Sequence, residues 1–219
     1  EPIALIDAGL ITHYRTAASV LLAAKKYAPN HSKILTIIGP GNHGQAAALF
    51  ILEHYDIEKV NVIARSASSA DAFKDYIHAS FGDNVIIETN ASVACCIQES
   101  DIVVVATTSM QPVLLAEYLR VNGSDQFICG LTAFNDIEDS VIDQVDHIIF
   151  DDGLRAIQRI AEISKIDFAE IPQSRLHSMT DPANLDGHTV AGVNLYLPVG
   201  ISAMDIAIAA YLYKIVTTA

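Results

Sequence analysis

The sequence predicts an α/β fold of the Rossmann type, a doubly wound parallel sheet with helices on both faces. Between residues 34 and 150, short apolar runs alternate with helical stretches, which is typical of strand–helix repeats in a parallel sheet. The first of these runs ends in the turn GPGNHG, which has the form G-x-G-x-x-G. The 219-residue chain is 51% hydrophobic, so it can bury a large core, and this composition argues against disorder.

The segment before residue 34 holds two predicted elements. Pro2–Ile6 reads as a strand with open edges, so it is expected either to be cut from a longer protein or to need a partner strand from elsewhere. A helix is predicted over 11–28, with Thr12 as a possible cap and Pro29 as its end.

The alternating region follows in order. Apolar runs with the length and β-branched content of buried strands predict strands at 34–38, 60–64, 85–88, 102–106, 126–129 and 147–150. The stretches between them predict helices at 45–55, 67–81, 91–99, 112–119 and 141–145.

The pattern changes after residue 150. A helix is predicted over 153–165, a loop-rich stretch over 170–192, and an apolar strand over 193–196. The final helix, 201–215, is apolar nearly all round, so we expect it to be buried against the rest of the chain or against another subunit.

Composition excludes several classes of function. With 13 basic and 26 acidic residues the net charge is −13, which repels the phosphates of nucleic acids. The most apolar stretch, 190–216, contains Asn194, Pro198 and Asp205 and is not expected to span a membrane. The eight histidines lack ligand spacing, so no metal site is predicted. The three cysteines form no disulfide framework and are expected to pack as small apolar groups, which fits a reducing compartment such as the cytoplasm.

The glycine-rich turn predicts a dinucleotide site, because it follows a strand and opens a helix. Gly39 permits the tight turn, Gly41 lets the backbone approach a pyrophosphate, and Gly44 allows close packing of helix and strand. With Asn42, these residues present the free N–H groups of a helix N-terminus to phosphates. His43 is either a further contact to the phosphate or nicotinamide, or simply a polar residue tolerated in a turn.

The end of the second strand bears on the choice of cofactor. No acidic residue stands there to bind the ribose 2′-OH of NAD; Arg65 and Ser66 stand there instead. A guanidinium pairs well with a 2′-phosphate, so NADP is favoured over NAD unless Arg65 is merely solvated.

The fourth strand ends in small residues that suit the ribose and nicotinamide. Ala106, Thr107 and Thr108 are predicted to bind the cofactor. Ser109 either joins them or caps the next helix.

Several segments together resemble the ornithine cyclodeaminase/μ-crystallin family. They are ALIDAGLITHYRTAAS at 4–19, IIGPGNHGQ at 37–45, VNVIARS at 60–66, SDIVVVATTSMQPVL at 100–114 and VNLYLPVGISAMDIAIAAYLY at 193–213. The resemblance implies a homodimer that acts on a small amino acid or imine with a nicotinamide cofactor. It also implies a dinucleotide-binding domain over 29–189, and a substrate and dimerisation domain to which 1–28 and 190–219 contribute.

The resemblance also assigns roles to single residues. Arg15 matches the family's arginine that binds the substrate carboxylate, unless it is only a surface arginine. Gly130 and Leu131 are expected to contact the cofactor. Thr132, which stands where cyclodeaminases carry an aspartate, is the second candidate catalytic residue beside Arg15. Asp136 could replace that acid only if the loop is built differently.

Other departures bear on the activity that the resemblance implies. Leu197 and Pro198 replace side chains with donors near the nicotinamide, and roughly a hundred residues that precede this stretch in the family are not in the chain. We therefore expect reduction of an imine or oxidation of an α-amino acid. Cyclodeamination, or cofactor binding without catalysis, remain the alternatives.

Two acidic positions stay open. Asp205 in the final helix caps the turn near Gly200, pairs with a cation, or lines the active cleft. Asp151, next to Asp152 and Arg155, is expected at a solvated junction between strand and helix.

Overall fold

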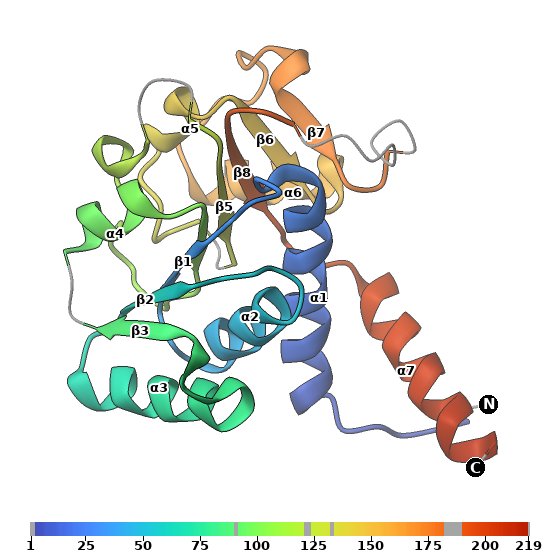
Figure 1. The fold of residues 1–219 in the computed structure, drawn as a ribbon. Coiled ribbons are helices and arrows are strands. Elements are labelled where there is room, and N and C mark those ends of the chain that lie inside the picture. Colours follow the sequence, from blue (N-terminus) through green and yellow to red (C-terminus); the bar gives the residue numbers. More distant parts are fainter. Residues whose placement is uncertain (1–2, 90–91, 121–123, 132–133, 182–189, 219) are drawn as a thin grey trace.

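The computed structural model describes residues 3–89, 92–120, 124–131, 134–181 and 190–218. Within these ranges, eight parallel strands form one sheet in the order β3-β2-β1-β4-β5-β8-β6-β7 (Figure 1). Their bounds are Ile34–Ile38 (β1), Lys59–Ile63 (β2), Ile86–Thr89 (β3), Ile102–Val105 (β4), Gln126–Gly130 (β5), His147–Phe150 (β6), Leu176–Ser178 (β7) and Val193–Leu197 (β8). The predicted α/β class with a parallel sheet is confirmed.

Helices cover both faces of this sheet. They are Gly9–Tyr27 (α1), Asn42–Leu52 (α2), Ala67–Phe81 (α3), Val93–Glu99 (α4), Val141–Gln144 (α5), Gly153–Ile163 (α6) and Ser202–Thr218 (α7), with short 3₁₀ turns at Gly82–Asn84, Ala116–Tyr118 and Gln173–Arg175. Successive strand residues enter two cores: Ile37 packs with α1, α2 and α3, whereas Ile38 packs with α5 and α6. This alternation explains why strands buried on both faces read as continuous apolar runs.

Two predicted elements are absent from the described residues. Residues 3–8 form no strand, and the side chain of Ile3 is 78% exposed, because no strand of the sheet lies beside this segment; Pro2 lies outside the described residues. The predicted helix at 112–119 is also wrong apart from a 3₁₀ turn at Ala116–Tyr118. Its first part instead runs beside residue 137, because the N–H groups of Val113 and Leu114 donate to the carbonyl of Asp136.

The last strand enters the middle of the sheet. β8 pairs with β5 on one side and with β6 on the other, so residues 193–197 are a structural part of the parallel sheet. The loop-rich stretch 170–192 also contains the edge strand β7, which pairs with β6. The division of the chain into two domains stays a prediction.

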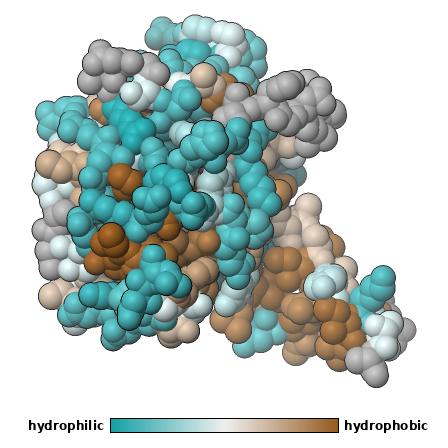
Figure 2. All heavy atoms as spheres, viewed as in Figure 1, coloured by the Kyte–Doolittle hydropathy of each residue, from teal (hydrophilic) through white to brown (hydrophobic). Residues whose placement is uncertain are grey.

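The final helix is not buried within this chain. α7 contacts α1, but none of its residues is buried, and Figure 1 shows it projecting from the body of the molecule on the same side as residues 3–8. Its apolar side chains give the brown surface on this side in Figure 2. No helix in the described part of the chain is long and apolar enough to cross a bilayer.

Candidate functional site

The glycine-rich turn lies between β1 and α2 at the carboxyl edge of the sheet. Gly39 has a φ of +93°, and a Cβ there would lie 2.4 Å from the carbonyl oxygen of Ala106. A Cβ on Gly44 would lie 2.3 Å from the carbonyl oxygen of Gly39, so the helix and turn can approach this closely only without a side chain. At Gly41, in contrast, a Cβ would meet nothing within 4 Å. The turn therefore packs tightly against the protein at Gly39 and Gly44 and has free space beside Gly41.

The open side of the turn presents the N-terminus of α2. Gly41 is its N-cap, and no side chain caps the first N–H groups of the helix. Such uncapped groups, together with the helix dipole, form a site for an anion.

A cavity of about 390 Å³ adjoins this turn. Its floor is the glycine turn, and its walls come from the ends of β2 and β4, including Ala64, Arg65, Ser69, Ala106, Thr107 and Thr108. No acidic side chain is among the described residues that line it. The shape and lining fit a dinucleotide, because the cavity runs from the helix N-terminus to a strand end that carries a cation.

The strand end at the far side of the cavity holds the two residues predicted to recognise NADP. Arg65 is exposed and makes no hydrogen bond or ion pair with any described residue. Ser66 has a local task, because its hydroxyl caps α3 by accepting the N–H of Ser69 at 3.3 Å. Ser69 lines the cavity instead. The sequence did not predict this, because several serines follow Arg65 and their order does not show which one caps α3 and which one faces the cavity.

Hydrogen bonds hold the turn after β4 in place. Thr107 Oγ1 donates to Asp136 Oδ2 at 2.9 Å and accepts the N–H of Ser109 at 3.1 Å. Ser109 Oγ in turn donates to the carbonyl of Gln111 at 2.7 Å, so it closes a turn and caps no helix. Asp136 is fully buried at this bond, so its carboxylate supports the cavity wall.

A second group of polar residues gathers around Arg15 on α1. Arg15 Nε lies 3.1 Å from Asp205 Oδ1 of α7, which gives Asp205 its cation, although the N–H is not aligned for a hydrogen bond. No described residue accepts a hydrogen bond from Arg15 Nη1 or Nη2. A Cβ on Gly200 would lie 3.0 Å from Nη1, so the guanidinium rests against the turn that follows β8.

His43 connects the glycine turn with this group. Its ring packs edge-on against that of His13, with 4.8 Å between centroids, and its buried Nδ1 has no hydrogen-bond partner among the described residues. Burial lowers the pKa of His43, and the nearby His13 and Arg15 lower it further. The neutral imidazole faces the side on which Arg15 lies, whereas the phosphate contact stays a prediction.

Asp151 corrects the expectation of a solvated junction. It is 1% exposed, and its carboxylate accepts the N–H groups of Val199 at 3.2 Å and Gly200 at 2.6 Å. Burial of this carboxylate is possible because backbone donors surround it. It thereby fixes the turn against which Arg15 rests.

The residues predicted at the end of β5 are not among those that line the dinucleotide cavity. Gly130 and Leu131 line a separate, smaller pocket beside β8. Thr132 lies outside the described residues. No group of three or more His, Cys, Asp or Glu side chains within the described ranges is placed to hold a metal ion.

Comparison with known proteins agrees with this geometry. The sequence model of the ornithine cyclodeaminase/mu-crystallin family matches residues 1–218. A Delta(1)-pyrroline-2-carboxylate reductase of Bacillus thuringiensis is 27% identical over 227 residues, which are 98% of this chain and 67% of that protein.

Two solved structures share the fold. The Thermococcus litoralis Delta(1)-pyrroline-2-carboxylate reductase in complex with NADH and L-proline has a TM-score of 0.80 at 22% identity, covering 97% of this chain and 67% of its own. An archaeal alanine dehydrogenase dimer with bound NAD has a TM-score of 0.80 at 21% identity, covering 98% of this chain and 67% of its own. The chain thus spans about two thirds of the length of these proteins.

Proposed function

The chain belongs to the ornithine cyclodeaminase/mu-crystallin family, and from this premise we propose that it is an NAD(P)-dependent oxidoreductase that reduces an imine, or oxidises the corresponding α-amino acid. The observation that carries the proposal is the pairing of an open glycine turn with Arg15 at one edge of the sheet. Relatives named as pyrroline-carboxylate reductases support the imine as the reacting group.

When bound, a reduced nicotinamide cofactor supplies the hydride, so that an imine, NAD(P)H and one proton give the amine and NAD(P)⁺. The residues of this chain bind and orient the reactants. The N-terminus of α2 and the turn around Gly41 receive the diphosphate, and Thr107 and Ala106 shape the wall beside the reacting end.

Arg15 positions the substrate. Its terminal nitrogens are not hydrogen-bonded to described residues, so they can bind the α-carboxylate bidentately while Nε stays in its ion pair with Asp205. Asp205 and the turn at Gly200 keep the guanidinium in one orientation, which limits the entropy lost when the substrate binds.

Reduction fits this chain better than cyclodeamination. Thr132 stands at the position of the aspartate of cyclodeaminases, and a threonine hydroxyl does not ionise near neutral pH, so it cannot act as that acid or base. The proton for the amine then comes from solvent or from a neighbouring group of the site.

Among nicotinamide cofactors, NADP fits the cavity better than NAD. Arg65 lacks a partner within the described residues, and no acid among the described lining residues would oppose a 2′-phosphate.

The cellular compartment proposed for the protein is the cytoplasm. All three cysteines are free thiols, and Cys129 is buried, which agrees with a reducing environment.

The assembly proposed for the protein is a homodimer. On α7, Ile206 is 66% and Val216 77% exposed, and Ile3 on the neighbouring segment is 78% exposed. A continuous apolar surface of this kind favours association with a second copy. Light scattering of the purified protein tests this, and a monomer at micromolar concentration would contradict it.

The activity is tested with protein expressed from its complete gene. Oxidation of NADPH or NADH is followed at 340 nm with cyclic and linear imino acids, including Δ1-pyrroline-2-carboxylate, and ornithine-dependent ammonia release is measured in parallel. We expect cofactor oxidation without ammonia release. Ammonia release from ornithine with no imine reduced would assign the cyclodeaminase activity instead.

A matched pair of variants then tests the role of Arg15. Arg15→Met is expected to lower kcat/KM about a hundredfold, because the α-carboxylate of the substrate loses the cation that binds it. Arg155→Met is the control: it removes an arginine that is 74% exposed and lies outside both pockets. Equal effects of the two substitutions would refute the role given to Arg15.

A further inference from the structure

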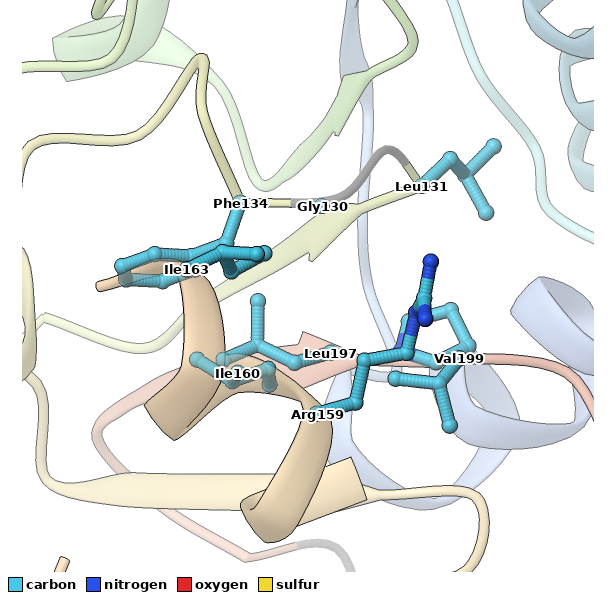
Figure 3. A pocket seen from close by; sticks show the side chains of 9 residues that line it. Gly130, Leu131, Phe134, Arg159, Ile160, Ile163, Leu197 and Val199 are labelled. Atoms are coloured by element: carbon cyan, nitrogen blue, oxygen red, sulfur yellow. The ribbon is translucent and has the colours of Figure 1, made fainter. Parts of the chain in front are cut away.

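A second pocket lies at the carboxyl ends of β5 and β8. It has a volume of about 170 Å³, and its described lining is apolar apart from one charged side chain, Arg159 of α6. Figure 3 shows Ile160 and Ile163 of the same helix on one side, Leu197 and Val199 on another, and the guanidinium of Arg159 turned towards Leu131. An apolar pocket with one cation is the lining expected for a small ligand that carries one anionic end.

Arg159 has no partner within the described residues. No hydrogen bond or ion pair joins it to any of them, although the chain has 26 acidic and only 13 basic residues. Arg155, one turn earlier on α6, instead pairs with Asp152 at 3.5 Å. Arg159 is exposed overall, so a carboxylate that enters the pocket can reach its guanidinium without displacing another described residue.

The pocket adjoins the group around Arg15. Val199 lines the pocket, and the next residue, Gly200, lies against the Arg15 guanidinium. Buried Asp151 holds the N–H groups of both residues of this turn, so the two arginines approach the same rigid segment.

The pocket also adjoins the dinucleotide cavity. The N–H of Leu131 donates to the carbonyl of Val105 at 2.8 Å, and the next residue after Val105, Ala106, lines that cavity. A substrate whose reacting carbon faces the cavity, and whose α-carboxylate meets Arg15, can therefore extend its side chain towards Arg159.

Resting on the proposed function, we propose that this pocket binds the distal carboxylate of the substrate, so that the preferred substrates are imines of dicarboxylic 2-oxo acids. The apolar walls contact the methylene groups, and Arg159 binds the terminal carboxylate. Arg159 acts as a specificity-determining residue and takes no part in the chemical step.

The test compares 2-oxo acids that differ only at the far end. NADPH oxidation is measured in excess ammonia with 2-oxoglutarate and 2-oxoadipate, and with 2-oxopentanoate and 2-oxohexanoate, which lack the distal carboxylate. We expect kcat/KM to be at least about tenfold higher for the better dicarboxylate than for its monocarboxylate counterpart. Arg159→Gln is expected to abolish this preference, Arg159→Lys to retain part of it, and Arg155→Gln to leave it unchanged.

The result that would overturn the proposal is equally specific. A wild-type protein without preference at either chain length, or an Arg159→Gln variant that loses activity equally on both series, would show that the pocket does not bind the distal carboxylate.

A binding measurement separates this proposal from the proposed function. Glutarate is expected to raise the Tm of the wild-type protein more than pentanoate does, and Arg159→Gln is expected to remove the difference. If no imine is reduced but this difference is present, the proposed function fails and the anion pocket stands. If imines are reduced but glutarate and pentanoate act alike on both proteins, the pocket proposal fails alone.

Discussion

The contrast between two glycines of the turn provides a test of where a cofactor lies. Gly41→Ser adds a side chain at a position where a Cβ meets nothing within 4 Å. The backbone there has φ −76° and ψ −172°, which serine adopts without strain. Gly44→Ala adds a single methyl group that would lie 2.3 Å from the carbonyl oxygen of Gly39.

The two variants should have different effects: Gly41→Ser should weaken cofactor binding, whereas Gly44→Ala should lower the stability of the fold. Serine is a preferred N-cap residue, so Gly41→Ser should change the free energy of unfolding by no more than about 0.5 kcal/mol. Its Cβ and hydroxyl nevertheless occupy the space and the N–H groups that a diphosphate needs, so NADPH binding should weaken at least about tenfold, or 1.4 kcal/mol. Gly44→Ala should cost about 1–3 kcal/mol of stability because backbone must move, despite the gain that alanine brings within a helix.

Both quantities are readily measured. The chain has no tryptophan, so the fluorescence of NADPH itself reports binding, and urea unfolding followed by circular dichroism reports stability. If Gly41→Ser binds NADPH as tightly as the wild-type protein, the diphosphate does not lie against Gly41, and the placement of the cofactor at the α2 N-terminus is refuted. A loss of stability in Gly41→Ser comparable to that in Gly44→Ala would refute the geometric reasoning itself.

Three further predictions concern the cofactor, pH and assembly. Arg65→Ala should weaken NADPH binding about tenfold and leave NADH binding nearly unchanged; equal losses in titrations of both would assign Arg65 to the adenosine or to structure. Burial lowers the pKa of both His147 and His177, whose rings share a hydrogen bond at 2.9 Å. The unfolded chain therefore binds protons first as pH falls through 6.5, the ordinary histidine pKa, so the free energy of unfolding should fall between pH 7.5 and 5.5. His177→Gln should flatten this dependence in urea titrations, and an unchanged slope would contradict the assignment. Substituting both Ile206 and Val216 of α7 by Asp should convert the dimer to a monomer in light scattering while the Tm of the monomer stays close to that of the wild-type protein.

Much of the sheet is predictable from sequence because buried parallel strands and their stop signals are local. The strands at 34–38 and 147–150 and the helix at 67–81 have the predicted bounds. Gly39 ends the first of these strands with a positive φ, and Gly82, also at positive φ, ends the helix. Where an element ends in a backbone conformation that favours glycine, the position of the glycine in the sequence predicts the boundary.

Other parts depend on contacts between distant residues. The segment 112–119 has helix-forming composition, but Asp136, far along the chain, accepts its N–H groups and holds it extended. β7 has only three residues and exists because β6 lies beside it. Asp151 lies in the sequence DDG, which is typical of a surface turn. Its burial depends on the N–H groups of Val199 and Gly200, which come from the turn after β8. Arg159 gives no signal at all in the sequence, because the pocket it faces is built from three separate segments.

The arginines show how the strand order creates this site. Insertion of β8 between β5 and β6 brings the turn at 198–200 beside α1, so residues about as far apart as the chain allows meet at one edge. Three of the six arginines bind groups of this chain away from both pockets: Arg120, Arg155 and Arg175. The other three, Arg15, Arg65 and Arg159, face the two pockets or the turn between them.

This distribution matters because the chain carries a net charge of −13, which repels anionic ligands at long range. Long-range repulsion between exposed charges falls as salt is added, whereas an ion pair formed at contact distance is screened less, so added salt weakens the repulsion more than it weakens the contacts. An acidic protein can thus bind a phosphorylated cofactor and a carboxylate substrate, provided that arginines such as Arg15, Arg65 and Arg159 are gathered where those anions lie.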